Sequence, residues 1–323
     1  MNRTDILELL GADWTRVQAI LKEALHSDVP LLAGINSDIT SHPGKMLRPM
    51  VLLLIARAAG RITEDSLRYA AAVELLHNAT LMHDDVTDNS SERRGMPTLG
   101  SLIGPSAAVL VGDFWLARAV ETVLGTTHHN RIIKYFSKTL TDLAEGEMLQ
   151  LEKAGTADTA EEDYFRIIYC KTASLFEAAS ISASASVDAS DELLEAARRY
   201  GKYLGIAFQI KDDILDYAGT PEMGKPVGVD LKEKKITLPL LCAMQNCPAR
   251  EEEIRGKVRA IDGHPEYCDE IAAFVREADG IRLAAARLEE YVNMAVGALA
   301  AFPYSPEKKA LSDLAAYNAI RTI

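Results

Sequence analysis

The distribution of proline is the feature that most limits how this sequence can fold. None of its twelve prolines lies within residues 106–220, and proline is the residue that most strongly interrupts an α-helix. Inside this interval, apolar side chains recur every three to four residues in segments rich in Ala, Leu, Glu and Lys, at 112–124, 130–154, 160–183 and 191–218. Period-two alternation bounded by hairpin turns is missing from the sequence. The pattern therefore predicts an all-α protein.

Helical patterning continues on both sides of the proline-free interval. Residues 46–60 and 66–88 precede it, and the second segment is apolar on nearly every side, which is typical of a helix in the middle of a core. Residues 220–237 are dense in Gly, Pro and Lys and predict a functional loop, after which helical patterning resumes. Neither a linker nor a fixed-period repeat divides the chain, so we expect one domain over residues 1–323.

The composition excludes several classes of function. The 323 residues include 35 Lys and Arg against 47 Asp and Glu, for a formal charge of −12, so the basic excess of a general nucleic-acid-binding protein is lacking. Four cysteines without a CxxC pair predict reduced thiols. No apolar stretch reaches the length of about 18 residues that a membrane span needs, and the N-terminus lacks a secretory signal. We expect a cytoplasmic protein without a nucleic-acid partner or membrane span.

Two acidic motifs with the same spacing end two of the expected helices, in HDDVTD and in FQIKDDILD. Their carboxylates are Asp84, Asp85, Asp88, Asp212, Asp213 and Asp216. Side chains four residues apart share one face of a helix, and sites made of oxygen ligands select Mg²⁺ or Ca²⁺. A solvated acidic helix end would explain a single motif. Two copies predict two helices whose carboxylate ends face each other across one cavity and bind a metal ion.

Carboxylates around Mg²⁺ require an anionic ligand such as a phosphate to complete the shell. Basic residues stand in loops or at helix ends, at Lys45, Arg48, Arg93, Arg94, Lys171, Lys225 and Lys235. Each alone would be an ordinary surface charge, whereas together they predict two anion subsites, one bridged by metal and one purely basic. A nucleotide-binding GxxxxGK[ST] motif and a G-x-S-x-G elbow are both missing. Apolar helices lead into both acidic motifs, which favours metal-assisted chemistry on a diphosphate joined to a hydrocarbon.

These residues resemble the trans-isoprenyl diphosphate synthases, also called polyprenyl synthetases. The resemblance rests on eight blocks in the family's order: GKMLRP, HDDVTD, RRGMPT, GDFWLARA, GEMLQ, KTASLF, FQIKDDILD and GKPVGVDLKEKKITLPLL. It implies an all-α bundle around a deep central cavity, acting as a homodimer with three Mg²⁺ ions per active site. Such enzymes ionise an allylic diphosphate such as farnesyl diphosphate, join it to isopentenyl diphosphate and remove a proton. Membrane contact is implied at most transiently, for product release.

The resemblance also implies a role for each residue in the matching motifs. Asp84, Asp88 and Asp212 would bind Mg²⁺, with Asp85, Asp213 and Asp216 assisting directly or through water. The implied catalytic set is Asp84, Asp85, Asp88, Arg93, Lys171, Asp212 and Lys225. The residues for the allylic diphosphate are Arg93, Lys171, Thr172, Gln209, Lys225 and Lys235. Those for isopentenyl diphosphate are Gly44, Lys45, Arg48, His77 and Arg94.

The sequence leaves more than one role open for His77, Glu147 and Gln150. His77 could be a satisfied core histidine rather than a ligand of isopentenyl diphosphate. In GEMLQ, Glu147 and Gln150 could be ordinary polar helix residues or could support the residues of the site. The sequence also departs from the family pattern at Lys234, where many members have Gly, and at a C-terminal end that is less basic than usual.

Product length is implied by the residues just before the first motif. In the family, a bulky aromatic residue four or five positions before the first Asp stops elongation, and this sequence has Thr80 and Ala79 there. We therefore expect a long, octaprenyl-like product for quinone side chains, with a medium-chain farnesyl or geranylgeranyl diphosphate synthase as the alternative. The floor of the product cavity could come from Leu75 or Leu76, or from Tyr135 and Phe136, although large residues of this kind are more often simple core.

Three other classes of protein compete with this interpretation. The ExxH pairs Glu23–His26 and Glu74–His77 resemble those of di-iron bundles, but an iron site leaves both acidic motifs and every lysine unexplained. Terpene cyclases share the first acidic motif, yet normally pair it with an Asn/Ser/Glu metal motif. A non-catalytic partner subunit of a heteromeric synthase would tend to lose one acidic motif, and both are intact here.

Overall fold

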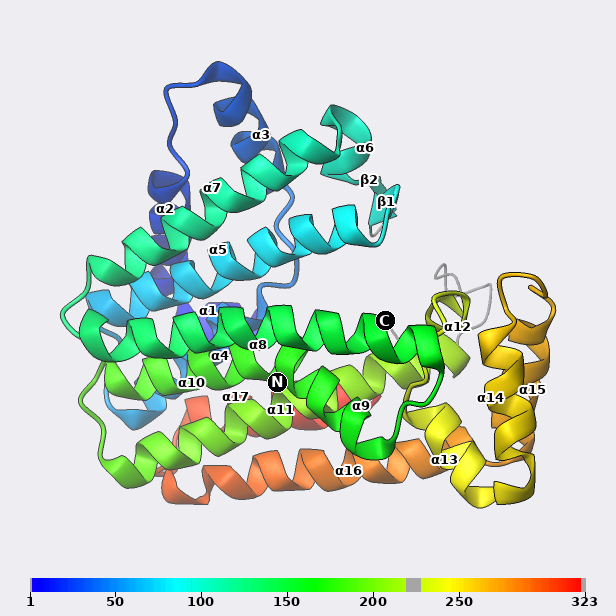
Figure 1. Ribbon diagram of the computed structural model, residues 1–323. Coiled ribbons are helices and arrows are strands. Elements are labelled where there is room, and N and C mark those ends of the chain that lie inside the picture. Colours follow the sequence, from blue (N-terminus) through cyan, green and yellow to red (C-terminus); the bar gives the residue numbers. More distant parts are fainter. Residues whose placement is uncertain (1, 94, 219–227, 321–323) are drawn as a thin grey trace. The chain divides into compact units, whose positions relative to one another are not determined.

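The structure is a computed structural model that describes residues 2–93, 95–218 and 228–320 (Figure 1). Helices make up most of the described residues, and strands are confined there to one short antiparallel hairpin, which confirms the predicted all-α class. The chain divides into two compact units. Unit one is Met1–Phe136, Ala178–Ala197 and Ala301–Leu311, and unit two is Ser137–Glu177, Arg198–Ala300 and Ser312–Ile323. The single domain expected from the sequence stays a prediction.

Unit one contains the N-terminal helices and the hairpin. Its elements are α1 (Arg3–Leu10), α2 (Ala12–Ala24), α3 (Pro30–Ser41), α4 (Leu47–Ala59), α5 (Glu64–Thr87), β1 (Glu92–Arg93), β2 (Met96–Pro97), α6 (Leu99–Ile103) and α7 (Pro105–Leu124). Unit two contains α9 (Glu161–Ile168), the π-helical turn η1 (Tyr169–Ala173), α12 (Val229–Lys232), α13 (Leu238–Asn246), η3 (Pro248–Arg250), α14 (Glu251–Arg259), α15 (Tyr267–Glu277) and α16 (Gly280–Ala298). Elements with residues in both are α8 (His129–Thr156), α10 (Ser174–Ala185), α11 (Asp191–Ala218), η4 (Leu299–Ala301) and α17 (Pro306–Ile320).

Helix α5 is the central helix of unit one, as the apolar pattern of residues 66–88 predicts. It packs against α2, α4 and α7, and its middle is buried on all sides. The Thr63 side chain accepts a hydrogen bond from the Ser66 N–H and caps the helix start. Helix α7 runs beside α5 (Figure 1) and approaches it at Gly112, where a Cβ atom would lie 2.4 Å from the His83 ring. The packing therefore fixes the helix that ends in the first acidic motif.

Buried and partly buried polar side chains hold the N-terminal helices of unit one in place. Asn36 of α3 accepts a hydrogen bond from the Trp115 indole at 2.8 Å and donates one to the Leu25 carbonyl at 2.8 Å. Arg57 of α4 donates to the Leu9 carbonyl of α1 at 2.5 Å. Buried groups of this kind are costly to leave without a partner, so these contacts specify where α1 and α3 lie.

In unit two, α13 packs mainly against α16 and also contacts α14 and α15. Gly280 opens α16 at a point where a Cβ atom would meet the Pro239 carbonyl oxygen at 2.2 Å, so only glycine allows this close approach. The predicted loop at 220–237 lies partly outside the described residues and contains the short helix α12. All four cysteines are free thiols, as predicted. None of the helices in residues 2–93, 95–218 and 228–320 has the length and apolar character needed to span a bilayer.

Candidate functional site

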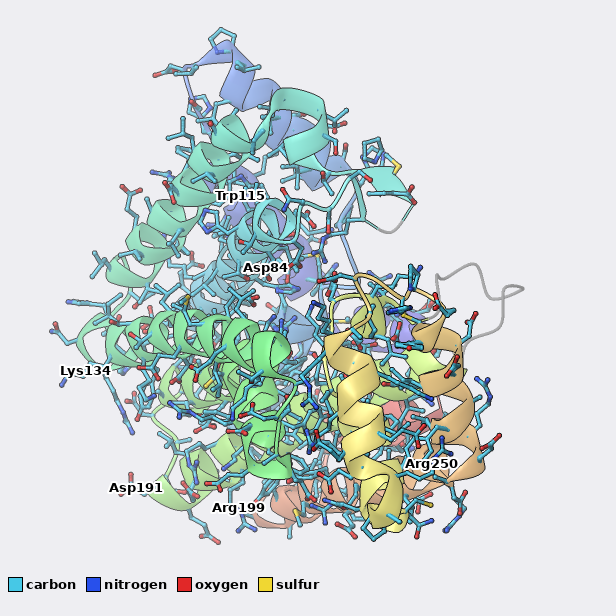
Figure 2. The ribbon with its side chains drawn as sticks, turned by 45° about the vertical axis from the view of Figure 1, so that its right-hand side comes forward. Asp84, Trp115, Lys134, Asp191, Arg199 and Arg250 are labelled. Carbon is cyan, nitrogen blue, oxygen red and sulfur yellow. The ribbon has the colours of Figure 1, made fainter. Side chains whose placement is uncertain are left out.

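The first acidic motif lies at the C-terminal end of α5. Asp88 caps the helix and donates its N–H to the Asp84 carbonyl at 2.8 Å, and the Ser90 N–H donates to the Asp85 carbonyl at 2.9 Å. Figure 2 shows Asp84 on this helix, with Trp115 on the neighbouring α7. Like charges repel, and the negative end of the helix dipole also disfavours carboxylates. A cation bound at this helix end would relieve both effects.

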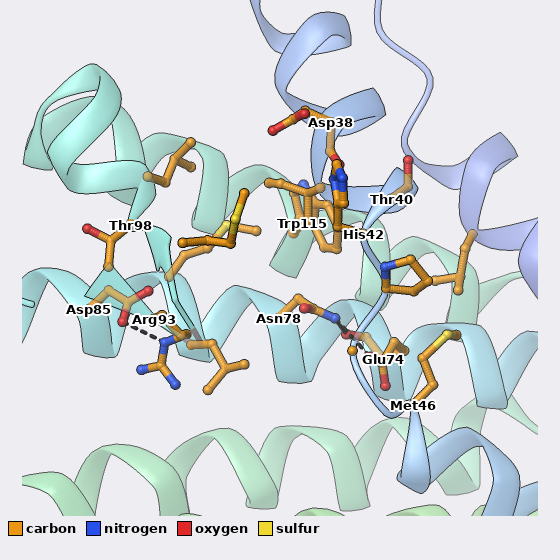
Figure 3. A pocket seen from close by; sticks show the side chains of 18 of the residues that line it. Asp38, Thr40, His42, Met46, Glu74, Asn78, Asp85, Arg93, Thr98 and Trp115 are labelled. Carbon is orange, nitrogen blue, oxygen red and sulfur yellow. Dashed lines mark hydrogen bonds and ion pairs between the residues drawn. The ribbon is translucent and has the colours of Figure 1, made fainter. Parts of the chain in front are cut away.

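The hairpin after α5 brings Arg93 to the same place. Strands β1 and β2 pair Arg93 with Met96, and Gly95 takes a φ of 77° in the turn between them. Arg93 Nε donates to Asp85 Oδ1 at 2.6 Å (Figure 3), and the Asp85 side chain is only 10% exposed. Asp85 therefore orients an arginine that the sequence assigns to the allylic diphosphate. Arg94 lies outside the described residues.

Two residues predicted to bind isopentenyl diphosphate meet in unit one. Arg48 Nη1 of α4 lies 3.0 Å from His77 Nε2 of α5. A guanidinium can only donate, so Nε2 accepts and the His77 ring carries its proton on Nδ1. Gly44 and Lys45 lie in the loop just before α4, where Lys45 is exposed. The structure thus unites Arg48 and His77, while the binding role of all four residues stays a prediction.

Unit one contains a cavity of about 470 Å³ that no motif of the sequence indicates. One face of α5 lines it, with Glu74, Asn78, Leu81 and Asp85 at helical spacing. Opposite that face stand the hairpin, α6, Trp115 of α7 and the loop that contains Gly44 (Figure 3). The helical spacing of these α5 residues was the available signal, but their mixed polarity hid it. Among the predicted site residues, Gly44, Asp85 and Arg93 border this cavity.

In the second motif, Asp213 is an internal anchor of unit two. It is 3% exposed, Tyr164 Oη donates to its Oδ2 at 2.6 Å, and Gln209 Nε2 donates to its Oδ1 at 2.8 Å. Burial raises the pKa of Asp213 to about 7, against the two hydrogen bonds, which lower it. Tyr164 is missing from the predicted site because 49 residues separate it from Asp213.

The other two carboxylates of this motif have different surroundings. Asp216 accepts hydrogen bonds from the backbone N–H groups of Val229 at 3.1 Å and Asp230 at 3.2 Å, at the start of α12. Burial raises the pKa of Asp216 as well. Asp212 is partly exposed. The backbone contacts of Asp216 tie the end of α11 to the segment that carries the predicted lysines.

Lys171 and Thr172 lie on the π-helical turn η1, which interrupts the continuous apolar spacing of residues 160–183. Two glycines let neighbouring helices close on this turn. A Cβ atom on Gly146 of α8 would lie 2.6 Å from Cys170 Cβ, and one on Gly205 of α11 would lie 2.5 Å from Ala173 Cα. Turns of this kind are often found at functional sites. The turn is therefore closely packed by two neighbouring helices, a contact that the local sequence pattern does not contain.

Side chains of unit two gather around this turn. Thr172 Oγ1 donates to Gln209 Oε1 at 2.7 Å, and Lys171 forms an ion pair with Glu147. Gln150 Nε2 in turn lies 3.5 Å from Glu147 Oε1. Of the two roles that the sequence left open for Glu147, the contact with Lys171 favours support of a site residue. Lys171, Thr172 and Gln209, all predicted for the allylic diphosphate, are therefore brought together.

The lysines that follow α12 form ion pairs within unit two. Lys235 pairs with Glu233, and Lys234 pairs with Asp262. Lys234 has a φ of 57°, in the left-handed region that favours glycine. This conformation explains why glycine suits the position in many members of the family that the sequence resembles. Lys225 lies outside the described residues.

The residues expected to set product length lie midway along α5. Ala79 is 1% exposed, and Thr80 is partly exposed with its hydroxyl donating to the His77 carbonyl at 2.9 Å. Among the possible floor residues, Leu75, Leu76 and Phe136 are buried and Tyr135 is partly exposed. Burial fits both a cavity floor and simple core, so their role stays a prediction.

The described residues give no support to a di-iron centre. Within residues 2–93, 95–218 and 228–320, no three His, Cys, Asp or Glu side chains gather as a metal centre. Glu23 and His26 are exposed, and the His26 ring lies 3.6 Å from the exposed Asp28 carboxylate. His77 instead accepts from Arg48. The predicted metal ligands of both motifs are carboxylate oxygens, a donor set that fits Mg²⁺.

The fold and these residues define an all-α protein in which two helices, one ending in each unit, carry the acidic motifs. The polyprenyl synthetase family model matches residues 29–275. Octaprenyl diphosphate synthase of Escherichia coli is 39% identical over 98% of each chain. A decaprenyl diphosphate synthase from Rhodobacter capsulatus superposes with a TM-score of 0.92, covering 100% of both chains at 34% identity. A polyprenyl synthase from Caulobacter crescentus, solved with calcium and isoprenyl diphosphate, gives 0.90 at 34% identity, covering 100% of this chain and 98% of that one.

The chain belongs to the polyprenyl synthetase family. It is therefore a prenyltransferase, and the family resemblance drawn from the eight sequence blocks is confirmed.

Proposed function

We propose that this protein is a long-chain polyprenyl diphosphate synthase that extends an allylic diphosphate with isopentenyl diphosphate. The observation that carries the long-chain assignment is the pair of small residues, Ala79 and Thr80, directly before the first acidic motif on α5. Its relatives support the assignment, since they include an octaprenyl diphosphate synthase and a nonaprenyl diphosphate synthase. A medium-chain product is the alternative that the product assay distinguishes.

In the proposed reaction, Asp84 of α5, its capping residue Asp88 and Asp212 of α11 would hold Mg²⁺, with three ions per active site. When bound, the metal stabilises the negative charge on the departing diphosphate. Carboxylates at the end of α5 fit this role, because a bound cation offsets both their mutual repulsion and the helix dipole. We propose that the carboxylates of both motifs act in the same reaction.

The basic residues divide between the two substrates. Arg93, oriented by Asp85, and Lys171, on the π-helical turn, bind the allylic diphosphate, which has to depart. Arg48, together with the His77 that it contacts, binds isopentenyl diphosphate, whose diphosphate stays attached. Arginine and lysine suit these roles because charge-assisted hydrogen bonds to diphosphate oxygens are strong. The reaction also requires that water, which would capture the allylic cation, be excluded from the site.

The deciding experiment is chromatography of the products formed from radiolabelled isopentenyl diphosphate with farnesyl diphosphate as primer. We expect Mg²⁺-dependent products near the octaprenyl length, and addition of EDTA should stop their formation. Asp84→Ala and Asp212→Ala should each lower turnover by orders of magnitude while the circular dichroism spectrum stays helical. Near-normal turnover in either variant would refute the assignment. If this chain alone forms product, the alternative that it is a non-catalytic partner subunit is excluded.

We further propose that the enzyme acts as a homodimer in the cytoplasm, with transient membrane contact for product release. Large apolar side chains exposed in unit one support a partner surface, with Leu102 63% and Leu110 68% exposed. Sedimentation of the purified protein tests the dimer. A single species of monomer mass at assay concentration would refute it.

A further inference from the structure

Tyr164 is a buried residue of α9 that the catalytic assignments above leave without a role. Its side chain is 3% exposed, and its hydroxyl donates to Asp213 Oδ2 at 2.6 Å. Asp213 follows the proposed metal ligand Asp212, but both of its oxygens accept hydrogen bonds inside unit two. Both oxygens of the carboxylate are therefore engaged. A change at Tyr164 on α9 is expected to alter the hydrogen bond between Asp213 and Gln209 as well.

The chemistry of the donors and acceptors fixes the direction of each hydrogen bond. Both Asp213 oxygens accept, Oδ2 from the Tyr164 hydroxyl and Oδ1 from the amide nitrogen of Gln209, so Gln209 turns its nitrogen toward Asp213. The Gln209 carbonyl oxygen is then directed to Thr172, whose hydroxyl donates to it at 2.7 Å. The result is a continuous chain from Tyr164 through Asp213 and Gln209 to Thr172. If the Gln209 amide were flipped, its carbonyl oxygen would face the Asp213 carboxylate oxygen, and two acceptors would be in contact.

This direction decides what Gln209 and Thr172 can offer to a ligand. The single hydroxyl hydrogen of Thr172 is given to Gln209, so the Thr172 oxygen retains only acceptor sites. The Gln209 amide nitrogen has a second N–H besides the one directed to Asp213. A diphosphate has only acceptor oxygens at neutral pH. The Gln209 amide is thus the group of this pair that can donate to it.

We infer that Tyr164 is a positioning residue, which through Asp213 holds the Gln209 amide in the orientation that donates to the allylic diphosphate. The inference rests on the proposed function, because it needs an allylic diphosphate at Gln209 and Thr172, the residues to which the family resemblance assigns it. Packing supports the arrangement. Gly205, one turn before Gln209 on α11, lets α11 approach Ala173 of the π-helical turn. The Gln209 amide and the Thr172 hydroxyl can therefore meet directly.

The test is calorimetric titration with farnesyl diphosphate and Mg²⁺ in the absence of isopentenyl diphosphate, so that no turnover occurs. Tyr164→Phe removes one hydroxyl and keeps the ring. Without this donor, the Asp213 and Gln209 side chains lose their fixed orientation, and we expect the Kd of farnesyl diphosphate to rise about ten-fold. Steady-state kinetics should show the same rise in the KM for farnesyl diphosphate, with the KM for isopentenyl diphosphate unchanged.

The matched control is Tyr69→Phe. Tyr69 in unit one is also fully buried, and its hydroxyl makes a 2.7 Å hydrogen bond to Thr126. Both variants should lose similar stability, but Tyr69→Phe should leave the Kd of farnesyl diphosphate within about two-fold of the original. If both variants weaken binding equally, Tyr164 has a merely structural role and the inference is wrong.

Other outcomes are equally decisive. A folded Tyr164→Phe that binds farnesyl diphosphate as the original protein does overturns the inference and leaves the proposed function standing. If the unsubstituted protein does not bind farnesyl diphosphate, the proposed function fails and the inference fails with it. If thermal denaturation shows that Tyr164→Phe does not fold, Asp213→Asn provides the same test, because an amide at 213 cannot accept at both positions. Unchanged binding in that variant also overturns the inference.

Discussion

The Nε atom of Arg93 donates a hydrogen bond to Oδ1 of Asp85 over 2.6 Å, which joins the hairpin to the first acidic motif. The Asp85 side chain is only 10% exposed and has a cationic partner in Arg93. A carboxylate in a charge-assisted hydrogen bond is less available to a metal ion. Its principal effect is therefore expected on the position of Arg93.

Asp85→Asn tests this division of roles. The amide keeps the shape but loses the charge that orients Arg93, so we expect the KM for the allylic diphosphate to rise about ten-fold. The Mg²⁺ concentration that gives half-maximal activity should change little. Glu92→Gln, on the same hairpin, is the control and should behave as the original protein. A large rise in the Mg²⁺ requirement with an unchanged KM would instead make Asp85 a metal ligand.

Close packing around the π-helical turn leads to a second prediction. Gly146→Ala would place a methyl group 2.6 Å from Cys170 Cβ, so the turn that carries Lys171 and Thr172 has to shift. We expect a loss of about 1–3 kcal/mol in the free energy of unfolding, as for other overpacked cores, together with a raised KM for the allylic diphosphate.

The control for Gly146→Ala lies on the same helix. A Cβ atom at Gly155 of α8 meets no atom within 4 Å. Gly155→Ala should therefore leave the kinetics unchanged and raise the free energy of unfolding by up to about 1 kcal/mol, since alanine favours a helix. Thermal denaturation and steady-state kinetics measure both effects. Equal behaviour of the two variants would show that the turn is free to adjust.

The positions of many helices along the chain could be predicted because the apolar spacing that indicates a helix is local in sequence. The all-round apolar pattern of 66–88 predicts the central position of α5, and the structure gives Glu64–Thr87. Helix α3 was not predicted, since its position depends on Asn36, which contacts Trp115 on a distant segment. The π-helical turn was missed for the same reason. Two glycines on other helices allow those helices to pack closely against it, and this contact is not visible in the local pattern.

For the site, spacing predicted which residues carry the chemistry but not which residues hold them. The motifs assign Arg48 and His77 to the same substrate, and the structure places these two side chains in contact. By contrast, the partnership of Tyr164 with Asp213 depends on how α9 packs on α11. Asp85 and Asp213 occupy matching places in their motifs, yet one contacts an arginine and the other is buried with a tyrosine. Equal spacing thus does not imply equal surroundings.

The buried carboxylate of Asp213 predicts how stability depends on pH. Its pKa is about 7 in the folded protein against a usual 3.8, so the folded state retains a proton that the unfolded chain releases. The free energy of unfolding should therefore fall as pH rises from about 4 to about 7, and this contribution should level off above that range. In EDTA, chemical denaturation of Asp213→Asn at several pH values should give a flatter dependence. An unchanged slope would assign the effect to Asp216 and Asp230, whose pKa values burial also raises.

Adjacent residues of α5 allow the path of the growing product to be traced. Leu81 lines the 470 Å³ cavity of Figure 3, whereas Thr80 is partly exposed outside that lining. If the chain grows past Thr80, Thr80→Phe should shorten the products, and Leu81→Phe should leave their length unchanged. Ala79→Tyr should also shorten them, at a cost of about 1–3 kcal/mol because Ala79 is buried. The opposite result, with shortening by Leu81→Phe alone, would place the growing chain in the cavity of Figure 3. Chromatography of the radiolabelled products measures both.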